Sequence, residues 1–166
     1  MSLVIRDAAA ADFAGIAAIY AYHVLNGFGT FEETPPSRDE MLDRFAKVVD
    51  AGLPYLVAAE GDSVLGYAYA APYRPRSAYR FTVEDSVYVA LDGQRRGVGA
   101  MLLGRLVERC AAAGMRQMVA VIGDSGNLPS IALHEKCGFR HAGVLRDVGF
   151  KRNRWLDTVM MQRGLL

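Results

Sequence analysis

The sequence is poor in the features that mark secreted, membrane-bound and metal-binding proteins. It has only two cysteines, Cys110 and Cys137, and we interpret neither as a metal ligand. Free cysteine is among the residue types most often buried, so we interpret both as buried structural thiols. No apolar run approaches the roughly 18 residues of a membrane span, and Met1 to Ala11 lack the core of a signal peptide.

The sequence also lacks an excess of charge of either sign. Nineteen lysines and arginines against eighteen acidic residues give a formal net charge of +1, which supplies no strong field for DNA, RNA or an anionic membrane. Any anion site must therefore be local. These absences lead us to expect a soluble, cytoplasmic protein that binds neither nucleic acid nor membrane.

What the sequence does have is enough apolar residues for one core. The chain has 166 residues, of which 52% are hydrophobic and 22% charged, and a single domain usually holds about 100–200 residues. Burial on this scale offsets the conformational entropy that is lost on folding. We expect one domain spanning residues 1–166, without internal repeats.

Apolar periodicity and turn residues predict an alternation of strands and helices. Helices are expected at 12–26, 37–52, 98–114 and 127–136, the second opened by a capping box of Ser37 and Glu40. Strands are expected at 3–6, 55–60, 63–71, 81–90, 117–122, 139–145 and 155–162. Mostly antiparallel strands come first and a strand-helix-strand-helix unit follows, which predicts an α/β or α+β fold with one mixed sheet covered by helices.

The turn from Gln94 to Ala100 has the features of a phosphate-binding loop. Two glycines and an alanine remove side chains where a helix begins, so the first backbone N–H groups of that helix are free to bind an anion. Arg95 and Arg96 add local positive potential. The alternative is that the glycines only permit a tight turn, but the strand before and the amphipathic helix after favour phosphate binding. No G-K-[ST] follows, so the turn is not a P-loop.

The pattern Gln94-x-x-Gly97-x-Gly99, following Val87 to Val89, resembles the acyl-CoA signature of the GNAT superfamily of N-acetyltransferases. Further stretches are similar to the branch of that superfamily that acetylates phosphinothricin and methionine sulfoximine. They extend over nearly the whole chain and comprise Ile5-Arg6, residues 84–89, residues 127–139, Val148 to Lys151 and Arg154 to Asp157. This combination is far more specific than the two glycines alone.

The resemblance implies a central twisted sheet whose fourth and fifth strands splay apart, with the pantetheine arm of acetyl-CoA in the gap beside residues 86–90. It also implies that a backbone N–H around Val89 polarises the acetyl carbonyl. We expect no metal, because acyl transfer from a thioester needs none once the carbonyl has a fixed donor. The residues that would contact acetyl-CoA are Val87, Val89, Gln94, Arg95, Arg96, Gly97, Val98, Gly99, Ala100, Asn127 and Ser130.

Acetyl transfer to an amine requires removal of a proton, and Glu84 is the first candidate base. It matches a carboxylate of the branch, and burial among apolar neighbours is expected to raise its pKa. The alternative is a structural acid paired with Arg80, while Asp85 should point to the opposite face of the strand. His134 matches the histidine of the branch and is the second candidate, as base or proton relay, unless it is a structural histidine. The other two histidines have no comparable support.

Arg74 and Arg76 lie in the loop before the catalytic strand, and guanidinium groups suit a carboxylate or an oxidised sulfur or phosphorus group. Each is alternatively a solvated surface cation. Phe28, Phe31 and Tyr79 are expected to wall the same pocket. The resemblance favours the clamp, because the branch acetylates the α-amine of glutamate-like and methionine-derived small molecules. Phosphinothricin, methionine sulfoximine and methionine sulfone are therefore the candidate substrate types.

Two other functions compete with this interpretation. A sensor that binds acyl-CoA without turnover is disfavoured by Glu84, His134 and the arginine pair. Acetylation of protein lysines or N-termini is disfavoured by the same arginines, which suit a small anionic substrate. The resemblance also implies a homodimer, to which residues 146–155 are expected to contribute.

Overall fold

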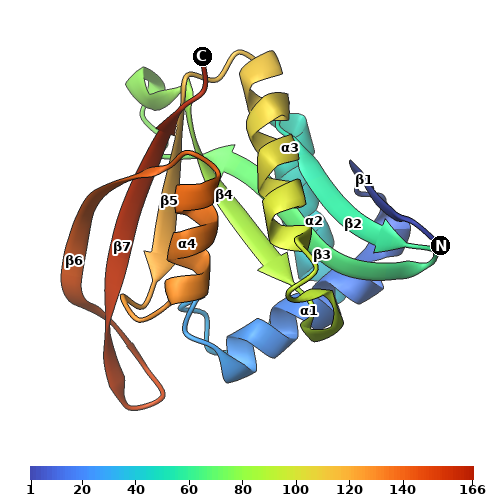
Figure 1. The fold of residues 1–166 in the computed structure, drawn as a ribbon, viewed down its shortest axis with the longest axis horizontal. Coiled ribbons are helices and arrows are strands. Elements are labelled where there is room, and N and C mark those ends of the chain that lie inside the picture. Colours follow the sequence, from blue (N-terminus) through green and yellow to red (C-terminus); the bar gives the residue numbers. More distant parts are fainter.

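A computed structural model describes residues 1–166, which form one seven-stranded sheet with helices on both faces (Figure 1). The strands are β1 Leu3–Asp7, β2 Tyr55–Glu60, β3 Ser63–Pro72, β4 Thr82–Val89, β5 Gln117–Gly123, β6 Arg140–Lys151 and β7 Arg154–Gly164. The α-helices are α1 Phe13–Asn26, α2 Arg38–Asp50, α3 Val98–Ala112 and α4 Leu128–Lys136. The spatial order is β1-β2-β3-β4-β5-β7-β6, and only β4 and β5 are parallel neighbours. This confirms the mixed sheet that the sequence predicted.

Helices α1 and α2 cover one face of the sheet, and α3 and α4 cover the other (Figure 1). The apolar positions that predicted α1 and α3 are the ones that the two helices bury against the sheet. No helix is long and apolar enough to cross a membrane. Cys110 is buried on α3, but Cys137 is only half-buried, so the interpretation of both as buried thiols is right for Cys110 alone.

The start of α2 shows how local chemistry fixes an element. The Ser37 hydroxyl accepts a hydrogen bond from the backbone N–H of Glu40 at 3.1 Å, which satisfies one of the free donors of the first helical turn. Gly114 ends α3 in the left-handed region, with a φ of +87° that a residue without a Cβ adopts at little cost. Both boundaries confirm the sequence prediction.

The strand predicted at 139–145 is too short. In the structure β6 continues to Lys151 and pairs along its length with β7, through a bulge in which Asp147 adopts a φ of +54°. The bulge interrupts the two-residue alternation from which strands are predicted, so the second half of β6 has no periodic signal. A tight turn at Arg152 and Asn153, with φ values of +51° and +60°, then joins β6 to β7.

The feature that positions the site is the separation of β4 from β5. The two strands pair only from Thr82 to Glu84, against Gln117 to Val119. Beyond Glu84 β4 stays bonded to β3 as far as Val89, while β5 follows β7, so the sheet opens between its two parallel strands. The splay that the resemblance implied is therefore present.

Candidate functional site

A cavity of ≈ 960 Å³ occupies the gap between β4 and β5. It is lined by β4, by the turn from Gln94 to Ala100, by the loop after α1, by the end of β5 and by α4. Elements that are distant in the sequence thus meet around one opening in the sheet. The splay supplies the space, because neighbouring strands at normal spacing leave none.

The edge of β4 that faces this gap carries unpaired backbone groups. Ala90 N donates to Leu65 O of β3, so the even-numbered residues of β4 direct their backbone groups to β3. The backbone groups of Val87 and the N–H of Val89 point the other way, beyond the three residues of β4 that pair with β5. An extended ligand that carries amide groups can therefore bind along this edge as an added strand does.

His23 of α1 lies at the end of this edge and lines the cavity. Its Nε2 is 2.9 Å from the Val89 carbonyl oxygen, and its ring packs on Tyr88 with the centroids 5.5 Å apart. The Val89 carbonyl is held by this contact, whereas the Val89 N–H is not involved in it. Nothing in the sequence distinguished His23, because the contact joins residues 66 positions apart.

The turn from Gln94 to Ala100 presents bare backbone at the start of α3. Arg95 and Gly97 both have positive φ, +60° and +76°, so the chain turns tightly here, as it does in backbone segments that bind anions through their N–H groups. A Cβ on Gly99 would lie 3.2 Å from a methyl group of Leu133, so the closeness of α4 also favours glycine there. The tight turn predicted before α3 is therefore formed, with α3 beginning directly after Gly97, and its binding of an anion stays a prediction.

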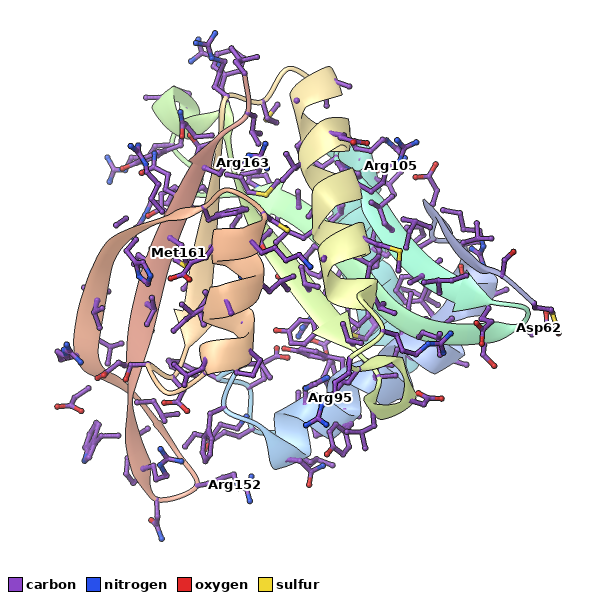
Figure 2. The ribbon with its side chains drawn as sticks, viewed as in Figure 1. Asp62, Arg95, Arg105, Arg152, Met161 and Arg163 are labelled. Atoms are coloured by element: carbon purple, nitrogen blue, oxygen red, sulfur yellow. The ribbon has the colours of Figure 1, made fainter.

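The two arginines of the turn are not equivalent. Arg96 donates to Glu60 at 2.7 Å on the far side of the turn and does not line the cavity. Arg95 lines the cavity and forms no ion pair with an acidic residue. Figure 2 shows Arg95 in the turn below α3. The sequence alone could not separate the two, because Glu60 comes from β2.

The start of α4 forms the opposite side of the cavity. The Asn127 side chain caps the helix by accepting from the N–H of Ser130 at 3.4 Å. Asn127 and Ser130 both line the cavity, as do Gln94 and Val98. All the predicted cofactor residues except Arg96 are thus gathered around one opening.

Glu84 lies half-buried where β4 and β5 part, and it lines the cavity. Its carboxylate forms no ion pair; Arg80, the expected alternative partner, instead donates to the Ser77 carbonyl and lies over the Phe81 ring. Burial is the main cause that raises the pKa of Glu84, and the charge of Asp85 adds to it. An unpaired carboxylate with a raised pKa at the edge of a cavity is suited to accept a proton.

Asp85 and His134 form a buried pair on the α4 side of β4, which confirms that Asp85 faces away from Glu84. His134 Nε2 lies 2.8 Å from Asp85 Oδ2, and its Nδ1 lies 2.7 Å from the Ser130 carbonyl. His134 is 4% exposed and Asp85 7%, yet both line the cavity. Burial acts to lower the pKa of His134, but the hydrogen bond and charge of Asp85 and the Ser130 carbonyl outweigh it and raise the pKa.

These two contacts decide what His134 can do with a proton. The Ser130 carbonyl only accepts, so Nδ1 carries a hydrogen. Nε2 faces a carboxyl group, which either accepts from an imidazolium or, as a carboxylic acid, donates to a neutral ring. Neither nitrogen has a free lone pair in either form, so in this arrangement the ring cannot itself remove a proton from an amine. Asp85 Oδ1 is buried without a partner.

Of the residues expected to bind the acceptor, Phe28 and Phe31 line the cavity and Arg74, Arg76 and Tyr79 do not. The Arg74 guanidinium lies 5.3 Å from the centroid of the Tyr73 ring, which contacts Tyr79 edge-on. The loop that carries them leaves the sheet beside Glu84, because the preceding strand pairs residue by residue with β4 up to that point. The structure therefore starts their loop beside Glu84 but does not bring the three side chains to the cavity.

Comparison with known proteins relates this site to acetyl transfer. The model of the acetyltransferase (GNAT) family matches residues 17–139. A phosphinothricin N-acetyltransferase from Alcaligenes faecalis is 58% identical over 98% of this chain and 81% of that protein. An L-methionine sulfoximine/L-methionine sulfone acetyltransferase from Pseudomonas aeruginosa is 44% identical over 99% of this chain and 96% of that protein.

Solved structures agree with the sequence matches. A phosphinothricin acetyltransferase of the GNAT superfamily from Sinorhizobium meliloti, crystallised with AcCoA, superposes with a TM-score of 0.94 at 50% identity, over 99% of this chain and 89% of that chain. A putative acetyltransferase from Salmonella typhimurium with its cofactor acetyl-CoA gives 0.97 at 37% identity, over 100% and 95% of the two chains. The splayed sheet is therefore the shared framework of these proteins and this one.

Proposed function

The chain belongs to the acetyltransferase (GNAT) family and is an N-acetyltransferase, and from that premise we propose that it acetylates the α-amine of a small amino-acid-like substrate. Phosphinothricin, methionine sulfoximine and methionine sulfone are the acceptor types that the names of its relatives support. One observation carries the proposal. A single cavity connects the tight turn before α3, an unpaired strand edge and an unpaired carboxylate, Glu84.

The cavity fits acetyl-CoA, which would supply the acetyl thioester. In the proposal, the N–H groups from Arg95 to Ala100 bind the pyrophosphate, and the backbone of Val87 and Val89 pairs with the pantetheine arm. Asn127 and Ser130 lie beside that arm. The tight turn, the missing Cβ at the start of α3 and the free edge of β4 support this assignment.

The side chains then divide the proton transfers between them. Glu84 takes the proton that the amine loses as the C–N bond forms, directly or through a water. A backbone N–H around Val89 stabilises the developing oxyanion and needs no metal to do so. As the C–S bond breaks, His134, held by Asp85, gives a proton to the thiolate. The pair recovers that proton from solvent before the next turnover.

The acceptor is expected to lie between Glu84 and the loop after α1. Phe28 and Phe31 wall this end of the cavity. We retain Arg74 and Arg76, with Tyr79, as the proposed contacts for the carboxylate or the oxidised group of the acceptor. The register of β3 on β4, which starts their loop beside Glu84, supports this assignment.

Calorimetry with acetyl-CoA, followed by a thiol-release assay with a panel of amines, tests the proposal. We expect binding of acetyl-CoA and release of CoA with methionine sulfone, methionine sulfoximine or phosphinothricin. Binding without release for any amine would favour an acyl-CoA sensor. Peptides that outcompete free amino acids would favour a protein acetyltransferase, and failure to bind any CoA ester would overturn the central claim.

Arg95 lines the cavity and Arg96 does not, and this difference gives a prediction for the binding of acetyl-CoA. Arg95→Ala should weaken acetyl-CoA binding about tenfold, because one charge-assisted contact is worth roughly 1.5 kcal/mol. Arg96→Ala removes only an exposed ion pair with Glu60 and should change the affinity less than twofold. Calorimetry on both variants compares them directly. Equal losses in the two variants would contradict the assignment of Arg95 as the phosphate ligand.

We also propose that the protein is a homodimer that contacts its copy through the β6–β7 hairpin. Phe150 and Trp155 are 53% and 66% exposed there, with their ring centroids 4.8 Å apart, and Leu145 and Val148 extend the apolar patch. Light scattering should give twice the chain mass of 18.1 kDa. Trp155→Glu should shift the measured mass toward that of one chain. A mass of one chain for the unmutated protein would refute the proposal.

Two features support a cytoplasmic location, which we propose on that basis. Cys110 and Cys137 are both free thiols, as is usual in reducing compartments. Acetyl-CoA as co-substrate places the reaction where that thioester is made and consumed. Activity in a fractionated lysate of the source cell should therefore stay with the soluble cytoplasmic fraction.

A further inference from the structure

Lys151, at the end of β6, is a buried ammonium group that the proposed mechanism does not use. It is 2% exposed, and its Nζ donates to the Thr30 carbonyl at 2.8 Å, a contact that joins residues 121 positions apart. Burial lowers the pKa of Lys151, Arg152 adds to the effect, and the carboxylates of Glu33 and Glu32 oppose it. A charged group kept in such a place has to be held by its surroundings, and here the surroundings are the loop after α1.

Thr30 is the middle of the loop that walls the acceptor end of the cavity. It is buried, and its hydroxyl lies 2.8 Å from the hydroxyl of Tyr20 on α1. The neighbours of Thr30 in the chain, Phe28 and Phe31, line the cavity. Lys151 therefore fixes, through one backbone carbonyl, the segment on which both aromatic walls depend.

Gly123 of β5 and Gly149 of β6 allow the loop after α1 to pack closely against these strands. A Cβ on Gly149 would overlap the ring of Phe31, and one on Gly123 would fall 2.5 Å from the Phe28 carbonyl oxygen. Gly149 has no positive φ, so its backbone conformation is open to any residue and only the closeness of Phe31 excludes a side chain. Gly149 and Lys151 belong to the stretch Val148 to Lys151, whose role the mechanism leaves unexplained.

The Phe28 ring is held from its other side by the same hairpin. The guanidinium carbons of Arg154 and Arg152 lie 4.5 and 5.4 Å from the centroid of the Phe28 ring. Figure 2 shows Arg152 at the tip of the hairpin that β6 and β7 form. One end of this hairpin is thus packed onto the acceptor wall, while its Phe150 and Trp155 side chains are exposed.

We propose that Lys151 and Gly149 are positioning residues for the acceptor: they seat Phe31 and the Thr30 carbonyl so that the loop after α1 forms the amine-binding end of the cavity. The inference rests on the proposed function, since it takes that end of the cavity to be the acceptor site. It assigns neither residue a contact with acetyl-CoA. Their loss should therefore affect the acceptor and leave the cofactor almost untouched.

Lys151→Met tests the anchor, because methionine keeps the length of the side chain and removes the charge. We expect the KM for the amino-acid acceptor to rise about tenfold, because the variant loses the buried charge-assisted hydrogen bond that holds the loop. The KM for acetyl-CoA should stay within twofold. Lys47→Met, at an exposed position on α2, is the matched control and should change neither constant. Equal rises in both KM values, or no rise, would overturn the proposal.

Gly149→Ala tests the position of the Phe31 ring by adding a methyl group against it. It should raise the KM for the acceptor about fivefold, because overpacking displaces the ring. Gly143→Ala on the same strand is the control, since no atom lies within 4 Å of its Cβ position. Adding Phe31→Leu to Gly149→Ala should recover part of the loss. A Gly149→Ala enzyme with an unchanged acceptor KM would refute the role of Gly149.

Amide hydrogen exchange separates this inference from the proposed function. Residues 28–31 should exchange faster in Lys151→Met than in the unmutated protein, with no substrate present. If the enzyme acetylates none of the amines, the proposed function fails while this measurement still decides the anchoring. Unchanged exchange in the loop would overturn the anchoring even in an active enzyme.

Discussion

Replacing Glu84 by glutamine is expected to lower kcat about 100-fold, which is the usual contribution of a positioned general base. The amide keeps the shape of the side chain and cannot take up the proton that the attacking amine releases. KM for acetyl-CoA should stay within twofold, because Glu84 lies apart from the turn between Gln94 and Ala100 in the proposed complex. Steady-state kinetics with saturating acetyl-CoA measures both constants.

The pH dependence gives this prediction a signature. Since burial raises the pKa of Glu84 above its usual 4.5, kcat should fall as the pH drops through that raised value, and Glu84→Gln should lose this limb. A raised carboxyl pKa also means that the fold loses stability as the pH rises through it, so the variant should be as stable or slightly more stable at neutral pH. Glu108→Gln, exposed on α3, is the control. An unchanged kcat in Glu84→Gln would contradict the assignment of Glu84 as the general base.

Features that depend on neighbours in the chain could be predicted from the sequence. The cap of α2, the tight turn at the start of α3 and the opposed faces of Glu84 and Asp85 all follow from spacing over a few residues. The helical and strand periods identified nearly every element for the same reason. The splay of β4 from β5 came from the family resemblance, since no local pattern encodes which strands separate.

What the sequence could not predict lies in contacts between distant segments. Asp85 meets His134 across 49 positions, and Lys151 meets Thr30 across 121. Both are single side chains without periodicity, so only the folded arrangement makes them neighbours. The clamp of Arg74 and Arg76 stays a prediction, because neither side chain lines the cavity and only the start of their loop is placed beside Glu84.

The contact between Asp85 and His134 leads to the prediction with the largest effect on stability. His134→Ala should destabilise the fold by about 3 kcal/mol, because it leaves a buried carboxylate without its counter-charge. Asp85→Asn in that background should restore much of the loss, so that the double variant unfolds at a higher temperature than His134→Ala alone. Thermal unfolding of His134→Ala, Asp85→Asn and the double variant measures this coupling, with His141→Ala as an exposed control.

The pH dependence of the single variant Asp85→Asn shows whether the pair is charged. His134 has a raised pKa, so its pairing stabilises the fold fully below the unfolded value of about 6.5, and the stabilisation is lost as the pH rises through the raised pKa. The unfolding temperature of Asp85→Asn should therefore lie furthest below that of the unmutated protein near pH 6 and approach it at alkaline pH. The kcat of the variant should fall at least tenfold at neutral pH, because the ring no longer holds the proton that the thiolate requires. A constant difference in unfolding temperature across pH, with unchanged kcat, would mean that the pair only fills space.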